Sequence, residues 1–324
     1  MPNNQQLSNN IPSQIPQQAL KIPNRKKRLI QISSILIILL ILLGSIIFYY
    51  FYKPANTHTN IQTTDSNTQP EQITSVTSPT KPSIKHWLIS ENAADGLLTT
   101  PGGANFINAI NTPNTYEIVH GKKTDPLPNA THVLSFPSYQ KIQDAFTNNQ
   151  IPANIKVILY DNEIWPETPV NEQQQPFTYV PLAENVVHSH GLLFMNAPAA
   201  DLKRALDPAA SNNYAGYLQM KLATLAKYTD IFEIQAQNNP TVTEYVSFSQ
   251  QALAQARGAN SNAILLLGIT AKTTGPTSQE LIQEIQQTKN ITDGYWFNII
   301  GDEKNNLSSG INIALPVIQA LSSI

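Results

Sequence analysis

The chain of 324 residues contains no cysteine, and that absence removes several classes of chemistry. Disulfide staples, thiolate metal sites and a cysteine nucleophile are all excluded. Stability must therefore come from packing, and an apolar fraction of 41% is enough to fill a sizeable core.

Several catalytic and ligand-binding motifs are also missing. No Gly-x-Ser-x-Gly elbow is present for a Ser-His-Asp triad, and no glycine-rich phosphate fingerprint follows a strand. His188 and His190 lie two positions apart on an expected helix, so their side chains diverge and cannot chelate one metal together. His120 and His132 lie on early expected strands without a third ligand in the pattern. The sequence therefore predicts no metal site and no cofactor.

Basic side chains are scarce over most of the chain. Residues 1–84 hold seven of the 20 basic and two of the 22 acidic side chains, which leaves 13 basic and 20 acidic residues beyond. The part of the chain after residue 84 thus carries a net charge of −7. Because binding to nucleic-acid phosphates needs a basic face, we expect no nucleic-acid partner.

One long hydrophobic run, residues 29–52, holds 24 residues and no charge. A helix of this length crosses a bilayer core. Basic residues cluster just before it, at Lys21, Arg25, Lys26, Lys27 and Arg28. Because positive charge is retained in the cytoplasm, we predict a single-pass cell-membrane protein with a cytoplasmic N-terminus and an extracellular C-terminal domain. A cleaved signal peptide is the alternative, but the run is too long and no small-x-small site closes it.

The segments on either side of this run have biased compositions. Residues 1–28 begin with a stretch rich in Asn, Gln, Pro and Ser, which predicts a disordered cytoplasmic tail. Residues 53–84 are rich in Thr, Ser, Pro, Asn and Gln, which predicts an extended, disordered extracellular stalk. We therefore expect the folded domain to span residues 85–324, with the lipid bilayer as a partner through residues 29–52.

Short apolar runs alternate with amphipathic segments from residue 85 onwards. The expected strands are 86–90, 116–121, 131–136, 156–161, 192–197, 230–237, 263–270 and 294–299. The expected helices are 138–148, 172–190, 213–228, 241–258, 276–288 and 307–322, with only a short one in 91–115. Eight near-continuous apolar strands separated by helices favour a (β/α)₈ TIM-type barrel over an open doubly wound sheet.

The string "YDNEIW", residues 160–165, follows the apolar run of the fourth expected strand. Catalytic residues of such a barrel come from the carboxyl ends of its strands, and the period of two in an extended chain points Asp161 and Glu163 to the same side. Neighbouring carboxyls raise one another's pKa, and a protonated Glu can act as a general acid. We therefore predict Glu163 as the acid/base and Asp161 as its partner. The alternative is that both carboxylates only cap a helix or accept loop amides.

Other strand ends are rich in amides and aromatic rings. The residues expected to shape a substrate site are Tyr160, Trp165, Asn196, Gln235, Gln237, Trp296 and Asn298. Amide donors and acceptors beside a stacking ring suit a neutral polyhydroxylated ligand, so a polysaccharide is the expected partner. A structural interpretation stands beside this one, because polar residues at strand ends also satisfy loop backbone groups.

The strings "VILYDNE", "DIFEIQAQNNP", "AILLLGIT" and "GYWFNI" resemble glycoside hydrolase family 18 barrels over roughly residues 150 to 300. The resemblance implies that Glu163 is the acid and that Asp161 helps to position the acetamido group of the substrate, which serves as nucleophile. It also implies subsite roles for Gln235 and Trp296.

The chain departs from that family at three positions. Lys156 and Leu159 stand where the family's acidic run has Asp, and Gln237 replaces a Tyr of the sixth strand. The longer string "YDNEIWPETPVNEQ" resembles a group of membrane-anchored or secreted bacterial proteins, which implies a barrel but no particular reaction.

The expected function is that of a membrane-anchored extracellular glycoside-hydrolase-like protein acting on a cell-wall or environmental polysaccharide. One alternative is a non-catalytic barrel that binds glycan or a protein partner at the cell surface. Another is a structural envelope protein whose barrel mouth is filled by its own loops. A deep polar cleft beside Asp161 would argue against this last alternative.

Overall fold

The computed structural model describes residues 84–121, 125–207, 209, 214–302 and 306–321. The predicted cytoplasmic tail (1–28), the predicted membrane helix (29–52) and all but the last residue of the predicted stalk (53–84) lie outside these residues. Among the helices that the structure does describe, none combines the length and the apolar character needed to cross a bilayer.

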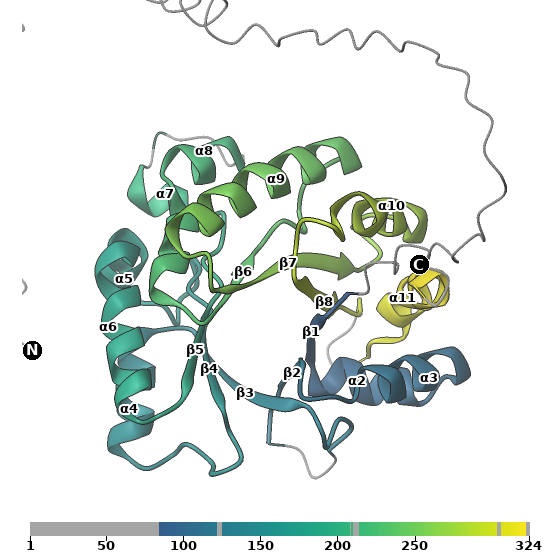
Figure 1. The fold of residues 1–324 in the computed structure, drawn as a ribbon, viewed down its shortest axis with the longest axis horizontal. Coiled ribbons are helices and arrows are strands. Elements are labelled where there is room, and N and C mark those ends of the chain that lie inside the picture. Colours follow the sequence, from purple (N-terminus) through teal and green to yellow (C-terminus); the bar gives the residue numbers. More distant parts are fainter. Residues whose placement is uncertain (1–83, 122–124, 208, 210–213, 303–305, 322–324) are drawn as a thin grey trace, which may run out of the picture. The chain divides into compact units, whose positions relative to one another are not determined.

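Eight parallel strands form a closed barrel in which each strand pairs with its neighbours in chain order and β8 pairs with β1 (Figure 1). The strands are β1 (His86–Ser90), β2 (Thr115–Ile118), β3 (Thr131–Phe136), β4 (Val157–Tyr160), β5 (Leu193–Asn196), β6 (Ile231–Ile234), β7 (Ile264–Ala271) and β8 (Gly294–Ile299). The predicted TIM-type barrel is therefore confirmed, and the ends of the expected strands differ from the observed ones by no more than three residues.

Side chains of the strands alternate between two apolar layers. The layer inside the barrel includes Leu88, Val133, Leu159, Met195 and Ile231. The layer between the strands and the helices includes Ile89, Ile158, Tyr160, Phe194 and Phe232. Because both faces of each strand are covered, the strands appear in the sequence as continuous apolar runs rather than as alternating ones.

Helices lie around the outside of the barrel (Figure 1). They are α2 (Glu91–Leu98), α3 (Pro101–Ile110), α4 (Tyr139–Thr147), α5 (Val170–Gln174), α6 (Pro176–Ser189), α7 (Leu202–Leu206), α8 (Tyr214–Gln219), the 3₁₀ helix η1 (Leu222–Tyr228), α9 (Val242–Ala259), α10 (Ser278–Thr288) and α11 (Ser308–Leu321). Side-chain caps fix several starts, because the hydroxyls of Ser90, Ser138, Thr241 and Thr277 accept hydrogen bonds from first-turn amides. At α10, Glu280 completes a capping box with Thr277.

Three helical segments differ from the expected ones. The segment expected as one helix over 172–190 is divided into α5 and α6, because Pro176 lacks an amide donor and disfavours helical geometry at the residue before it. The segment over 213–228 is divided into α8 and η1 at Lys221, which has a left-handed backbone. The region 91–115 forms two helices rather than one, and the second begins at Pro101.

Gly294 lies at the seam where the barrel closes. It pairs with His86 of β1 on one side and with Leu266 of β7 on the other. A Cβ atom on Gly294 would lie 2.0 Å from the carbonyl oxygen of His86. A larger residue would therefore force β8 away from β1, and glycine permits the close approach of the two backbones.

The outer face of β2 and β3 differs from that of the other strands. Between these two strands the described residues, 119–121 and 125–130, form no helix. Figure 1 accordingly shows loops rather than a helix outside this part of the barrel. The outer face of β2 and β3 is therefore where side chains can lie beneath a loop and remain polar.

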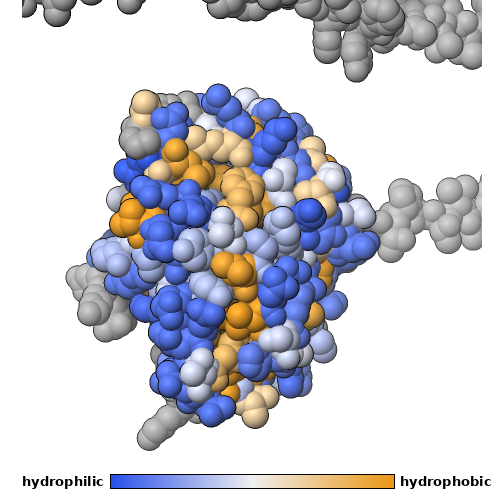
Figure 2. Space-filling model, turned by 90° about the vertical axis from the view of Figure 1, so that its left-hand side faces the viewer, coloured by the Kyte–Doolittle hydropathy of each residue, from blue (hydrophilic) through white to orange (hydrophobic). Residues whose placement is uncertain are grey.

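Figure 2 shows the side of the domain that carries α4, α5 and α6. Hydrophilic residues predominate on this face and separate the apolar residues into small groups. The large apolar residues exposed on α5 and α6 are Val170, Phe177 and Leu182. This mixture is typical of a helical layer that faces solvent.

Candidate functional site

Asp161 and Glu163 follow β4 directly, at the carboxyl end of the barrel. Leu159 belongs to the inner apolar layer and Tyr160 to the outer one, so the alternation along the chain directs Asp161 inward. Only 7% of Asp161 is exposed, whereas Glu163 is partly buried. The two predicted acidic residues thus lie at the end of the barrel where loops can form a site.

Gln235 connects these two carboxylates. Its side-chain Nε2 lies 3.2 Å from Oδ1 of Asp161 and 3.0 Å from Oε1 of Glu163, and it also lies 3.2 Å from the backbone oxygen of Ala197. An amide nitrogen has two hydrogens for these three acceptors, so at least one acceptor is left without a full hydrogen bond. The structure therefore brings together three of the residues that the sequence predicts for the site.

Both carboxyl groups have raised pKa values. Burial raises the pKa of Asp161 well above its usual range, and the nearby Glu163 carboxylate adds to the rise. Burial also raises the pKa of Glu163, with a further contribution from Asp201. Hydrogen bonds from Gln235 and Trp165 oppose this shift because they favour the ionised form. Two neighbouring carboxyls thus retain protons more strongly than free side chains do.

Glu233 is a third acidic residue of this group, and the sequence interpretation missed it. It lies in β6, two positions before Gln235, and it is fully buried. Within the described part of the chain, neither of its carboxylate oxygens has a hydrogen-bond partner. Burial, followed by the charges of Asp161 and Glu163, raises its pKa well above the usual range. The signal that could have found it is the period of two, which places Glu233 and Gln235 on one face of the strand.

Glu233 and Gln237 occupy space that a glycine leaves free on the neighbouring strand. A Cβ atom on Gly268 would lie 2.1 Å from Oε1 of Gln237 and 2.6 Å from Oε1 of Glu233. Oε1 of Gln237 is itself buried without a hydrogen-bond partner among the described residues. Gln237 also lines a separate cavity of about 320 Å³, so it lies near the predicted acid pair but opens to a different space.

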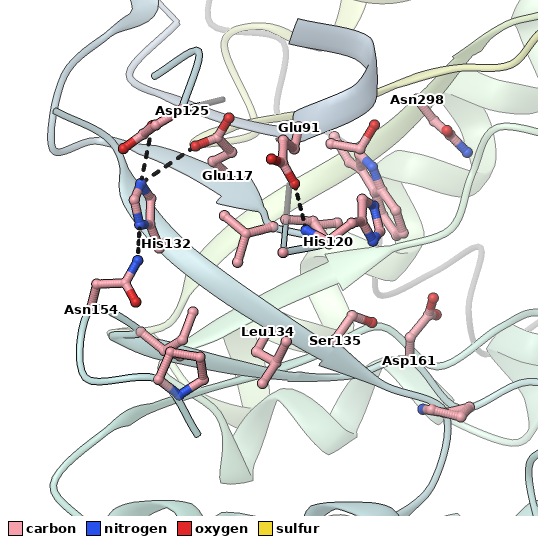
Figure 3. A pocket seen from close by; sticks show the side chains of 18 of the residues that line it. Glu91, Glu117, His120, Asp125, His132, Leu134, Ser135, Asn154, Asp161 and Asn298 are labelled. Carbon is pink, nitrogen blue, oxygen red and sulfur yellow. Dashed lines mark hydrogen bonds and ion pairs between the residues drawn. The ribbon is translucent and has the colours of Figure 1, made fainter. Parts of the chain in front are cut away.

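A cavity of about 980 Å³ opens at the barrel mouth and extends over the carboxyl ends of β2 and β3 (Figure 3). Four of the predicted site residues line it, namely Asp161, Trp165, Trp296 and Asn298. Glu163 and Gln235 instead line a smaller cavity of about 220 Å³, together with Asp201 and Tyr214. The acid pair therefore lies between two cavities, and the tryptophans belong to the larger one.

Tyr160 and Asn196 lie away from the cavity linings. The hydroxyl of Tyr160 is buried in the outer layer and donates a hydrogen bond of 2.7 Å to Glu172. The side chain of Asn196 is also buried, and its Nδ2 donates to the backbone oxygen of Tyr160 at 2.8 Å and to Asn162 Oδ1 at 2.9 Å. Both residues thus connect β4 to its surroundings, which is a structural role rather than the expected contact with substrate.

One group of described residues could hold a metal ion. Glu117, Asp125 and His132 place one ligand atom each within 4.8 Å of one another. They line the same large cavity as Asp161 but lie at its other end, at β2 and β3 (Figure 3). The sequence predicted no metal site because it offered no third ligand for His132, and the fold supplies two carboxylates beside it.

No protein-family model matches the chain, and no curated protein matches its sequence. Several solved structures are similar at low identity. The catalytic domain of a family GH18 chitinase from the fern Peteris ryukyuensis has 12% identity, with 76% of this chain and 93% of that chain covered and a TM-score of 0.41. A sugar phosphate isomerase/epimerase from Parabacteroides distasonis has 13% identity, coverages of 76% and 98%, and a TM-score of 0.44.

The spore cortex-lytic enzyme SleL of Bacillus megaterium is also similar, with 10% identity, coverages of 74% and 75%, and a TM-score of 0.39. The names of these proteins describe more than one kind of reaction, since a chitinase and a cortex-lytic enzyme stand beside a sugar phosphate isomerase/epimerase. Since one fold hosts many reactions, the comparisons assign no reaction to this chain, and its function has to be argued from the site.

Proposed function

We propose that this protein is a glycoside hydrolase of the cell surface that acts on a cell-wall or environmental polysaccharide. Glu163 is the acid/base and Asp161 is its partner. The observation that carries the proposal is the contact of both carboxylates with the single amide of Gln235, at the open end of the barrel. Acid/base catalysis needs closely placed carboxyls with raised pKa values, and burial raises both here.

In this reaction Glu163 gives its proton to the glycosidic oxygen, and the leaving sugar departs as an alcohol. Burial keeps that proton on Glu163 at a higher pH than an exposed Glu would allow. The resulting carboxylate then takes a proton from a water molecule whose oxygen forms the new bond to the anomeric carbon, which completes hydrolysis and restores the starting state. Asp161 supports the acid by sharing the amide of Gln235 with it, and Gln235 holds the two carboxyls in place.

The larger cavity offers a surface for the sugar. Trp165 is 39% exposed and lines this cavity with Trp296, and an indole ring can stack on the apolar face of a sugar. Asn298 lines the same cavity and provides an amide donor and acceptor for hydroxyl groups. A neutral polysaccharide is the ligand class that these groups suit.

A non-catalytic glycan-binding barrel is the second candidate function. The observation that favours it is the division of the acid pair, because Asp161 lines the larger cavity and Glu163 the smaller one. A sugar stacked on Trp165 and Trp296 would then contact Asp161, while the proton of Glu163 would face the smaller cavity. Binding without hydrolysis is the expected result of that arrangement.

The cellular location is part of the proposal. The uncharged run over residues 29–52 and the basic cluster that precedes it favour a membrane anchor with the barrel outside the cell. Protease treatment of intact cells should then digest the barrel domain and leave a protected N-terminal fragment. A barrel domain that stays intact until the cells are lysed would contradict this orientation.

The test of the reaction is the release of reducing ends by the full-length protein from chitin, peptidoglycan and a panel of neutral glycans. Glu163→Gln should abolish release while thermal stability is retained, because the amide has the same shape but cannot transfer the proton. Glu184→Gln is the matched control, since Glu184 lies on α6 and pairs with His188. If the wild type binds a glycan without releasing ends, and Glu163→Gln binds equally well, the binding module is the better description.

A further inference from the structure

Glu117 and His132 lie side by side on the outer face of the barrel. They are direct partners in the register of β2 and β3. Their neighbours Tyr116, Ile118 and Val133 belong to the inner apolar layer, so the alternation directs Glu117 and His132 outward. Among the described residues no helix lies between β2 and β3 along the chain, and Asp125 approaches this face from the loop between the two strands.

Glu117 is buried there without a hydrogen bond. Its side chain is 1% exposed, and neither carboxylate oxygen has a hydrogen-bond partner in the described part of the chain. Three further acidic residues, Asp125, Glu91 and Asp95, lie close enough to act on it. A buried carboxylate without donors is costly, and nearby acidic residues increase that cost. A cation at this position would remove the penalty.

The distances within the group suit a metal ion better than a hydrogen-bonded pair. Nε2 of His132 lies 3.4 Å from Oε2 of Glu117 and 3.6 Å from Oδ1 of Asp125. Both separations exceed the usual N–H···O distance of about 2.9 Å. Ligands about 2.1 Å from a tetrahedral zinc ion lie about 3.4 Å from each other. The imidazole is therefore separated from each carboxylate by about the distance between two ligands of one small divalent ion.

The other nitrogen of His132 also has a partner. Nδ1 lies 2.8 Å from the side-chain nitrogen Nδ2 of Asn154, on the side of the ring opposite to the two carboxylates (Figure 3). An amide can present either its oxygen or its nitrogen to the ring. When the oxygen faces Nδ1, it accepts the Nδ1 proton, and Nε2 is left with a lone pair directed at Glu117 and Asp125. A partner of this kind orients metal-binding histidines in general.

We propose that Glu117, Asp125 and His132 form a binding site for a divalent transition-metal ion of the zinc type. One imidazole and two carboxylates are a ligand set that zinc accepts, and three protein ligands leave a fourth position for water or a ligand oxygen. The group lines the same cavity as Asp161, so the fourth position faces the large cavity that opens at the barrel mouth. The site does not depend on the proposed hydrolase reaction.

The test measures Zn²⁺ binding to full-length protein from which metals have been removed, by calorimetry and by the rise of the thermal midpoint. One ion should bind per chain and stabilise the fold. Asp125→Asn is the first variant, because 49% of the Asp125 side chain is exposed and the fold should tolerate the change. The affinity should fall at least about 100-fold, since the loss of an outer-shell partner alone costs about 10–100-fold.

His188→Gln is the matched control. His188 lies 2.8 Å from Asp230 and 3.6 Å from Glu184, so it is another histidine between two carboxylates, but its ligand atoms do not form a group that could hold a metal. This variant should bind Zn²⁺ as the wild type does. Co²⁺ in place of Zn²⁺ should give visible absorption bands that Asp125→Asn removes.

Three results of the Zn²⁺ measurements would overturn the proposal. They are the absence of stoichiometric Zn²⁺ binding, an Asp125→Asn variant with wild-type affinity, and a loss of affinity that is equal in Asp125→Asn and His188→Gln. The first result would identify the group as a histidine packed beside two carboxylates without a metal ion. Tighter binding of Ca²⁺ than of Zn²⁺ would also contradict it, because imidazole favours transition metals over Ca²⁺.

Discussion

The substitution Tyr160→Phe distinguishes a structural tyrosine from one that contacts substrate. The Tyr160 hydroxyl donates a hydrogen bond of 2.7 Å to Oε2 of Glu172, and both residues are buried. Glu172 also accepts the backbone amides of Tyr139 at 2.6 Å and Gln140 at 3.2 Å, which belong to the first turn of α4. One carboxylate thus connects the end of β4 to the start of a helix.

Phenylalanine keeps the packing of the ring and removes only this hydrogen bond. Hydrogen bonds to charged groups contribute about 1.5–3 kcal/mol, and the lower end applies because Tyr139 still donates to the same oxygen of Glu172. For a domain of this size, a loss of about 1.5 kcal/mol lowers the thermal midpoint by about 3–6 °C. Glycan binding or hydrolysis at lower temperature should be unchanged.

Tyr217→Phe is the matched control for this measurement. The Tyr217 hydroxyl is also fully buried, but it has no hydrogen-bond partner among the described residues. Removing an unsatisfied hydroxyl should leave the thermal midpoint unchanged or raise it slightly. The reasoning is refuted if Tyr160→Phe keeps the wild-type midpoint and loses glycan binding, because Tyr160 would then act on substrate.

Three further changes follow from the buried acids and the glycine beside them. Gln235→Leu should raise the pKa of Glu163 further, since the hydrogen bond from Gln235 lowers it, and the basic limb of a pH–rate profile or a carboxyl NMR titration should move to higher pH. Burial raises the pKa of Glu284 from its usual 4.5 to about 8, so the folded state keeps a proton that the unfolded chain releases. Stability should therefore fall as the pH rises between those two values, and Glu284→Gln should reduce the fall in thermal midpoint between pH 5 and pH 8. Gly268→Ala should cost about 1–3 kcal/mol in the free energy of unfolding through its clash with Gln237 and Glu233, whereas Gly258→Ala, with open space around it, should be neutral or stabilising.

The barrel was predictable because its strands are buried on both faces. A strand such as "AILLLGIT" carries few polar residues, so its position and length are visible in the sequence alone. The division of a long helical segment at Pro176 was also within reach, since proline disfavours helical geometry in the residue before it. The two helices of 91–115 were harder to predict, because three glycines in the region weaken the helical pattern.

The sequence predicts the site residues that lie at the ends of strands but not the one that lies within a strand. Asp161, Glu163 and Gln235 were found because the carboxyl ends of parallel strands meet at one end of a barrel. Tyr160 was included although its position in the alternation directs it to the outer layer. Glu233 was overlooked because it lies within an apolar strand rather than at its end.

Asp125 shows a different limit of the sequence. It lies in the loop between β2 and β3, where no periodicity relates a side chain to a direction in space. His132 and Glu117 are neighbours only because of the register between β2 and β3, and that register cannot be derived from the sequence. A site built from a loop residue and a cross-strand pair therefore becomes visible only when the strands are paired.

The acid pair and the proposed metal ligands each contribute residues to the large cavity, and they face one physical problem, since each group buries carboxylates whose charge is costly. Glu163 and Asp161 share the amide donor of Gln235, and retained protons can neutralise them, which suits a group that transfers protons. Glu117 has no donor among the described residues, and its imidazole neighbour His132 lies 3.4 Å away, at the spacing of two ligands on one ion. Substituting Glu163 should therefore change activity without changing Zn²⁺ binding. Substituting Asp125 should weaken Zn²⁺ binding without changing activity. If either change altered both properties equally, the two groups would have to be regarded as one site.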